Sequence, residues 1–391
     1  MVSIKTSNNH NMLEWARDEV GYSIEQAAEA IGLSVMRLKA AESGDNPLTL
    51  KQLRTVAEKY GIPFGYFYLT KPPYKNSFKP VPDYRIEPGF VGTDHYRLNF
   101  EIKKARDQRL VFLELASSLD IPTKTFQLLP KENIITSGKI IRERLNVNDI
   151  EISSLRFGQT YSYWKSKIEE DGVLVFESQY LPEQSGVIGV AIYYQECPII
   201  LIKRGPSYNS RKLFTLLHEY AHLLKGKSAI NDASSQTTVL KNSEIANLEV
   251  ECHNLAAEIL IPSEKVELSD YVNLKITDKM ECLAKAFNVT YSTAAVCLWK
   301  LNFIGQSELT HLLALRKEAN KRKQEKQEEQ RKKGEGVKIP REVLMRLDLG
   351  SQMFGIVRQA YSSGVLDVFD ASRILNLRVN KIDKLVSKIP I

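Results

Sequence analysis

The chain has 391 residues, of which 43% are hydrophobic and 26% are charged, a composition that is typical of globular proteins and excludes a low-complexity or fibrous chain. This length exceeds what one ordinary hydrophobic core supports, so we expect several domains. The net charge of +7 permits contact with nucleic acid but is mild for a chain of this size.

The cysteines and the N-terminus indicate the cellular compartment. The four cysteines form no Cys-x-x-Cys pair and no even framework, so we expect reduced and mostly buried thiols; they are Cys197, Cys252, Cys282 and Cys297. The first residues contain no apolar signal segment, and no stretch approaches membrane-spanning length. We therefore expect a cytoplasmic protein without a membrane partner.

The first 70 residues are predicted to form short helices. Ser23 and Gln26 have the spacing of a capping box, and Gly32 ends the helix that they begin. Ser34 then caps a second helix over 35–42. Two short helices joined by a glycine-containing turn are typical of a helix-turn-helix. Two further helices are predicted over 48–60 and 64–69.

The second of the paired helices is a candidate DNA-reading helix. Ser34, Met36, Arg37 and Lys39 are expected to face outward, where basic side chains and the helix N-terminus can hold phosphates. The helix lacks the Gln, Asn and multiple Arg that read base edges well. The alternative is a protein-docking or dimerisation module, and only in the second case would the protein be a homodimer.

A proline-rich stretch separates this module from the rest of the chain. Beyond it, helices are predicted over 96–118, 140–145 and 152–167, and strands over 173–176, 187–194 and 198–203. The last strand, which contains residues 199–202, precedes the next helix directly. We expect it to be an edge strand that flanks a cleft and can hold an extended peptide by strand addition.

The most informative motif is His218-Glu219-Tyr220-Ala221-His222. On a helix, His218 and His222 lie one turn apart on the same face, so both can bind one metal ion while Glu219 reaches a water beside it. The surrounding helix is apolar nearly all round and therefore buried, where uncompensated histidines and a carboxylate are costly. These residues favour a zinc hydrolase over structural histidines.

Two histidines bind zinc weakly, so a third ligand is needed. The predicted helix over 245–261 carries Glu249 and His253, which share one face at a spacing of four residues. Glu249 is either this ligand or a solvated surface carboxylate. His253 is either a ligand, a donor to the transition-state oxyanion, or a partner that orients Glu249.

The C-terminal part of the chain is predicted to be helical. The segment 279–301 has a second helix-turn-helix-like spacing with few basic exposed positions. The segment 316–338 contains ten Lys or Arg and five Glu, which is typical of a solvated helical spacer. Residues 339–391 form a further small helical unit, for which we expect a role in protein contact.

Several blocks together resemble the ImmA/IrrE family of metallopeptidases with an N-terminal helix-turn-helix of the phage-repressor (XRE) type. They are Ser23-Ile-Glu-Gln-Ala-Ala, Leu38-Lys-Ala-Ala-Glu-Ser-Gly, Pro47-Leu-Thr-Leu-Lys-Gln-Leu, Pro63-Phe-Gly-Tyr-Phe-Tyr-Leu, Pro82-Asp-Tyr-Arg, Phe214-Thr-Leu-Leu-His-Glu-Tyr-Ala-His and Ala256-Ala-Glu-Ile-Leu-Ile-Pro. The resemblance implies that Glu249 is the third ligand of a gluzincin-like Zn²⁺ site. The Asn that is usual four residues later in the family is His253 here.

We therefore expect a multidomain, mainly α protein with a small β-sheet. The expected units are a helix-turn-helix bundle (1–72), a Pro-rich connector (73–90), an α+β zincin-like core (91–265), a helix-turn-helix-like segment (266–312), a charged spacer (313–338) and a C-terminal helical module (339–391).

The resemblance also implies a function. Zn²⁺ would be bound by His218, His222 and Glu249, with Glu219 and His253 as catalytic residues. The substrate would be a regulatory protein, most naturally a helix-turn-helix repressor, cut at one site in stress response or in mobile-element or toxin–antitoxin control. The alternative is a DNA-binding regulator or antitoxin-like protein whose metal site is structural or inactive.

Overall fold

The computed structural model describes residues 9–72, 94–181, 187–205, 211–232, 243–267, 274–314 and 341–382, except Gly21 and Phe157. The predicted Pro-rich connector lies outside these residues, as does the charged spacer beyond residue 314. None of the described helices is long and apolar enough to cross a membrane. The four cysteines are unpaired and three are buried, as expected, whereas Cys282 is exposed.

The N-terminal module is a small helical bundle around its own core. Its elements are α1 (His10–Glu19), α2 (Ile24–Ile31), α3 (Val35–Glu42), α4 (Leu50–Tyr60) and the 3₁₀ helix η1 (Phe64–Tyr68). The Ser23 hydroxyl accepts from the backbone N–H of Gln26, and the Gln26 side chain accepts from the Ser23 backbone, which confirms the predicted capping box. Ser34 caps α3 in the predicted place.

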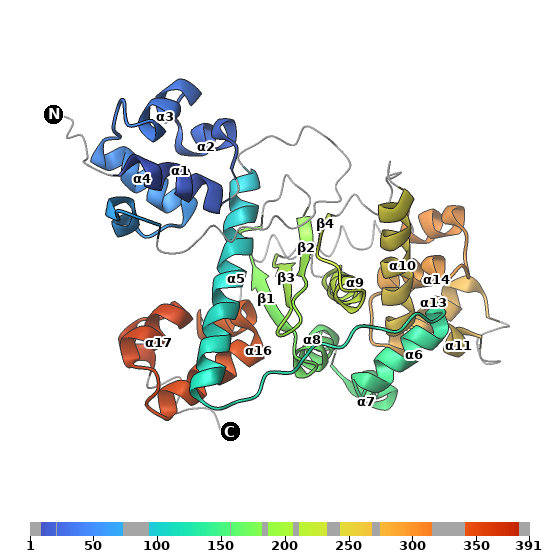
Figure 1. Cartoon of the computed structure of the whole chain (residues 1–391). Coiled ribbons are helices and arrows are strands. Elements are labelled where there is room, and N and C mark those ends of the chain that lie inside the picture. Colours follow the sequence, from blue (N-terminus) through green and yellow to red (C-terminus); the bar gives the residue numbers. More distant parts are fainter. Residues whose placement is uncertain are drawn as a thin grey trace, which may run out of the picture.

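The bundle rests on the first turns of a long helix, α5 (Asp94–Ser118) (Figure 1). The Asn99 side chain donates to the Val20 carbonyl at 3.1 Å. After α5, the chain forms α6 (Ile134–Arg144), α7 (Asp149–Ser154) and α8 (Thr160–Glu170). The single helix predicted over 152–167 is therefore wrong, because residues 155, 156, 158 and 159 are not helical and separate α7 from α8.

Four strands form one mixed sheet in the order β1-β3-β2-β4. They are β1 (Leu174–Ser178), β2 (Val187–Ile192), β3 (Ile199–Lys203) and β4 (Ala229–Asp232). β3 pairs in parallel with β1 and antiparallel with β2, so the expectation that β3 is an edge strand is wrong. β4, for which the sequence offered no strong pattern, pairs with β2 and forms the edge.

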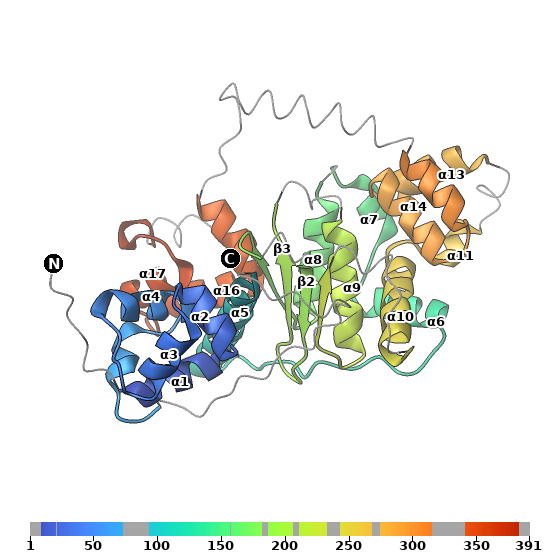
Figure 2. The ribbon, with the colours of Figure 1, turned by 90° about the horizontal axis from the view of Figure 1, so that it is seen from above.

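Helices cover both faces of the sheet (Figures 1 and 2). Neighbouring residues of a strand point to opposite faces of the sheet and so belong to two different hydrophobic cores. Val175 packs in the core that contains the helix of the His-Glu-x-x-His motif, and Phe176 packs in the core that contains α5. The metal-motif helix α9 (Lys212–Leu224) packs on β2 and β3. The remaining helices on that side are α10 (Ser243–Leu260), α11 (Ser263–Val266), α13 (Ile276–Ala286) and α14 (Tyr291–Lys300).

The second core is completed by the C-terminal residues. These form α16 (Arg341–Ser362), α17 (Val368–Leu375) and η3 (Val379–Lys381), and α16 packs against β1 and α5. Gly350 interrupts α16 with a φ of 75°, which favours glycine. A Cβ on this residue would lie 2.6 Å from the Val175 carbonyl oxygen, so the break lies directly against β1.

Buried side chains from α8 satisfy the two helix ends at this break. Lys165 donates to the Leu347 carbonyl at 3.0 Å. Glu169, which is 2% exposed, accepts from the backbone N–H of Ser351 at 3.0 Å and also from its hydroxyl. Because buried backbone groups need partners, these contacts fix the position of α16 on the sheet.

Glu169→Ala is expected to lower the free energy of unfolding by about 2 kcal/mol, because it leaves the Ser351 backbone N–H without its acceptor in a buried place. Urea denaturation measures the change. Glu170→Ala is the matched control, since its side chain is exposed at the same helix end. Equal unfolding midpoints for the two variants would contradict this role of Glu169.

Candidate functional site: a histidine and glutamate cluster between α9 and α10

Helix α9 is held in the interior at both ends. Every residue from Leu213 to Leu224 is buried, in agreement with the prediction of a helix apolar nearly all round. At its start, the Lys212 ammonium binds Glu177 of β1, a carboxylate whose side chain is fully buried. Just beyond its end, Lys225 pairs with Glu251 of α10. The buried contact with Glu177 ties the start of α9 to the sheet, whereas the Lys225–Glu251 pair lies at the surface, where ion pairs contribute little.

Three predicted ligands meet between α9 and α10. The Nε2 atoms of His218 and His222 are 3.0 Å apart. The two carboxylate oxygens of Glu249 each lie 3.2 Å from one of these nitrogens. Both histidines are fully buried and Glu249 is 6% exposed, so Glu249 is not the solvated carboxylate of the alternative interpretation.

The spacing of these atoms fits a metal ion. A tetrahedral zinc with bonds of about 2.0–2.1 Å separates its ligand atoms by about 3.3 Å. The distance between the two nitrogens, and the distance from each nitrogen to its own oxygen of Glu249, lie within a few tenths of an ångström of that spacing. Two nitrogens and one carboxylate oxygen are also a donor set that zinc prefers. The residues therefore fit the metal that the sequence motif implies.

The electrostatics of the cluster favour the protonation states that bind metal. Burial lowers the pKa of His218, although the nearby Glu249 acts in the opposite direction. Burial would raise the pKa of Glu249, but the two approaching imidazoles hold it well below its ordinary range. A neutral imidazole beside an ionised carboxylate is ready to ligate a cation.

His253 lies directly against this cluster. Its ring centroid is 4.1 Å from that of His218, and the nearest donor atoms of His218, Glu249 and His253 lie within 4.8 Å of one another. Its Nδ1 is 2.7 Å from the Glu249 backbone carbonyl, so Nδ1 carries the proton and donates. Burial, with His218 and Lys300 nearby, sets the pKa of His253 well below its ordinary value. The ring is therefore neutral, with a lone pair on Nε2.

Glu219 is fully buried on the side of α9 that faces β2. A Cβ on Gly189 of β2 would lie 2.4 Å from Glu219 Oε1 and 2.7 Å from Thr215 Cγ2. Only glycine allows the strand to approach this carboxylate so closely. Gly189 was not among the residues predicted from the sequence, although a glycine inside an apolar strand indicates such a close approach.

Lys300, the last residue of α14, is a second residue that the sequence did not reveal. Its ammonium lies 4.1 Å from the centroid of the Trp299 ring. Burial lowers its pKa to about 8, while its attraction to Glu249 acts in the opposite direction. The tertiary fold thus brings a cation into the electrostatic environment of the cluster, and no local pattern around residue 300 predicts this.

Comparison with known families supports the same interpretation. Residues 168–298 match the M78 peptidase model, which describes the IrrE N-terminal-like domain, and residues 13–67 match a helix-turn-helix model. The chain combines an XRE-type helix-turn-helix with an ImmA/IrrE-like peptidase domain. No curated protein and no solved structure matched the chain.

The peptidase match covers the sheet, α9 and α10 but not α5, α6 or α16. The match therefore includes every member of the cluster except Lys300, which lies two residues beyond it. The layer that covers the other face of the sheet comes from segments outside the family model.

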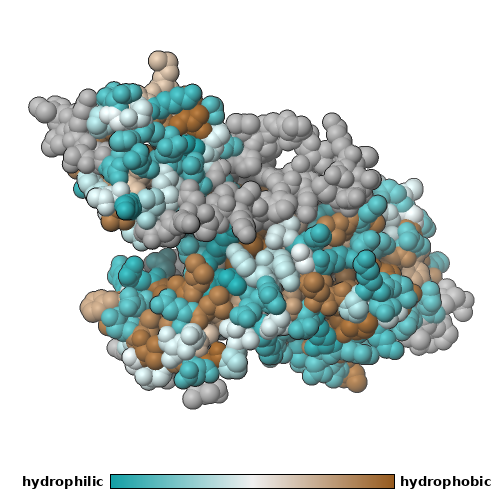
Figure 3. Space-filling model, in the orientation of Figure 1, coloured by the Kyte–Doolittle hydropathy of each residue, from teal (hydrophilic) through white to brown (hydrophobic). Residues whose placement is uncertain are grey.

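Of the four α3-region residues that were predicted to contact DNA, three are exposed: Ser34, Met36 and Lys39. Met36 is 82% exposed and Lys39 is exposed, whereas the Ser34 hydroxyl already caps the helix. Arg37 does not point outward as expected: its guanidinium donates to the carbonyls of Asn46 and Pro47 in the following loop. In the view of Figure 3, the described surface of this domain is mostly hydrophilic.

Gly189→Ala is expected to lower the free energy of unfolding by about 1–3 kcal/mol, because the new methyl group overlaps Glu219 and Thr215 in a packed interior. Chemical denaturation measures this. Gly355→Ala is the matched control, since a Cβ there meets nothing within 4 Å. If both variants had the free energy of unfolding of the parent protein, β2 would not lie in close contact with Glu219.

Arg37 and Lys39 are expected to respond differently to substitution. Arg37→Ala should lower stability by about 1–3 kcal/mol, because two loop carbonyls lose a charged donor. Lys39→Ala should leave stability unchanged and weaken binding to a short non-specific DNA duplex, with the salt slope reduced by about one. Thermal unfolding and fluorescence anisotropy measure the two effects. Unchanged DNA affinity in Lys39→Ala would favour the protein-docking alternative.

Proposed function

We propose that this protein is a zinc-dependent endopeptidase that cleaves a regulatory protein at one site. The observation that carries the proposal is the meeting of His218, His222 and Glu249 at ligand spacing, with Glu219 buried on the same helix. Zinc held by these three residues would polarise a peptide carbonyl and acidify a water molecule.

The protein's own residues would move the proton. Glu219 would accept the proton of the attacking water and pass it to the leaving amine. Its close contact with Gly189 limits the positions that the carboxylate can occupy, so that it is held in one orientation for this task. Glu249 and the two histidines would hold the metal, and their burial keeps competing water away.

For His253 we propose a role in positioning rather than as an oxyanion donor. Its only proton is committed to the Glu249 carbonyl, so its Nε2 can accept but cannot donate. The ring lies between His218 and Phe214, whose centroid is 6.0 Å away, and so supports the His218 imidazole. The lone pair on Nε2 also makes His253 a candidate for an additional ligand.

The edge of the sheet offers a place for the substrate. β4 pairs with β2 on one side, and no described strand pairs with its other side. β4 also contacts α9, which carries the cluster. We propose that a peptide lies along β4 as an added strand, because backbone hydrogen bonds hold an extended chain without regard to most of its side chains.

The substrate class follows from the combination of domains. A helix-turn-helix in the same chain would bring the peptidase to DNA or to another regulatory protein, so a helix-turn-helix repressor is the substrate that we propose. The exposed Met36 and Lys39 on α3 also support a second role, direct DNA binding by the N-terminal domain, since an apolar side chain and a cation can contact a thymine methyl group and a phosphate.

Glu219→Gln should retain zinc and lose cleavage by a factor of at least about 100, because the proton acceptor is removed while the ligands stay. His218→Ala should lose zinc. The protein is co-expressed with the product of the neighbouring gene, any cleavage fragment is identified by mass spectrometry, and zinc is measured by elemental analysis. Glu251→Gln, an exposed glutamate on α10, is the matched control.

Cleavage at the normal rate by Glu219→Gln would overturn the mechanism. Full zinc occupancy with no fragment from the parent protein would instead favour a regulator with an inactive metal site.

A further inference from the structure

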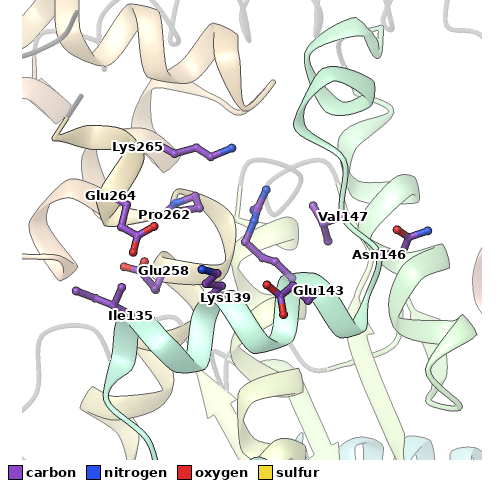
Figure 4. Close-up of a pocket in the computed structure, with 10 residues that line it drawn as sticks. Ile135, Lys139, Glu143, Asn146, Val147, Glu258, Pro262, Glu264 and Lys265 are labelled. Atoms are coloured by element: carbon purple, nitrogen blue, oxygen red, sulfur yellow. The ribbon is translucent and has the colours of Figure 1, made fainter. Parts of the chain in front are cut away.

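A cavity on the side of α10 away from the metal cluster has the features of a second binding site. It has a volume of about 450 Å³ and lies between α6, the end of α10 and α11 (Figure 4). This size is in the range of small-molecule sites. Glu258, which lines it, follows Glu249 by nine residues and so lies about 180° around the helix from that ligand.

The charges that line the cavity are balanced. Three cationic side chains and three carboxylates face it; they are Lys139, Arg142, Lys265, Glu143, Glu258 and Glu264. Arg142 and Lys265 are already compensated, because both bind Asp149. Lys139 makes no hydrogen bond or ion pair with a described residue, so one cation is left for a ligand.

Glu258 supplies the complementary charge. It is only 2% exposed, and its Oε1 accepts from the backbone N–H and the hydroxyl of Ser263 at 3.0 and 3.1 Å. Its Oε2 is buried and has no hydrogen-bond partner among the described residues. The nearby Glu264 adds a second carboxylate (Figure 4). Burial raises the pKa of Glu258, although Ser263 and Arg142 act in the opposite direction, and a ligand cation that reaches Oε2 would stabilise the ionised form.

The position of Glu258 is held by close packing. A Cβ on Gly138 of α6 would lie 2.5 Å from Glu258 Cγ, so the carboxylate cannot swing towards α6. Ile135 and Pro262 add apolar contacts beside it. α6 lies outside the segment that matches the peptidase model, so this cavity lies between the matched domain and a segment outside it.

We propose that the cavity binds a small zwitterion of the amino-acid class. The ammonium of the ligand would bind Glu258 and Glu264, and its carboxylate would bind Lys139. A ligand with a single charge would leave either the two glutamates or Lys139 without a partner, whereas a zwitterion satisfies both. The site is separate from the metal cluster and does not depend on the proposed peptidase activity.

The test titrates the full-length protein, freed of metal by a chelator, with each of the common L-amino acids singly in a calorimeter. Removal of the metal excludes binding by chelation at the cluster. At least one amino acid should bind saturably. Ethylamine and propionate each carry only one of the two charges, so each should bind the protein at least about tenfold more weakly than that amino acid.

Glu258→Gln should weaken binding at least about tenfold, and Lys139→Gln, an exposed position that folding tolerates, should weaken it several-fold. Glu251→Gln on the same helix is the control and should bind like the parent. If Glu258→Gln does not fold, Lys139→Gln decides. The proposal is overturned if no amino acid binds, if ethylamine binds equally well, or if Lys139→Gln leaves the affinity unchanged.

Discussion

The approach of Glu249 to both histidines is the contact on which the rest of the site depends. His218 and His222 are neighbours through one turn of α9, but their nitrogens would be an unsupported pair without the carboxylate from α10. This contact places an ionised group in a buried position between α9 and α10, which is tolerated only because the two imidazoles lie beside the carboxylate. A cation bound at the cluster would offset the cost of burying this charge.

The position of α9 in turn depends on charged and close contacts with the sheet. Lys212 binds Glu177, and the same carboxylate accepts from Lys165, whose ammonium also binds the Leu347 carbonyl of α16. A line of buried polar contacts thus joins the C-terminal helix to the start of the metal-motif helix. The C-terminal residues therefore pack on the same sheet as α9, on its opposite face, although they lie outside the segment that matches the peptidase model.

Features that depend on neighbours in sequence were predictable. The capping box of Ser23 and Gln26, the end of α3, and the shared face of Glu249 and His253 all follow from helical spacing, which is a local property. Features that depend on distant segments were not. Two carbonyls in the next loop decide the direction of the Arg37 side chain. The strands that pair with β3 decide its place in the sheet.

The sequence by itself determined the chemistry of the site, because two histidines and a glutamate at helical spacing in an apolar helix predict a metal ligand set and a proton acceptor. It also determined the helix that offers Glu249. Only the tertiary structure decided that Glu249 reaches both histidines, that Gly189 confines Glu219, that β4 forms the sheet edge, and that a charged cavity lies behind α10. The reason is physical: spacing along one helix sets which side chains share a face, whereas strand order and helix packing set what each face meets.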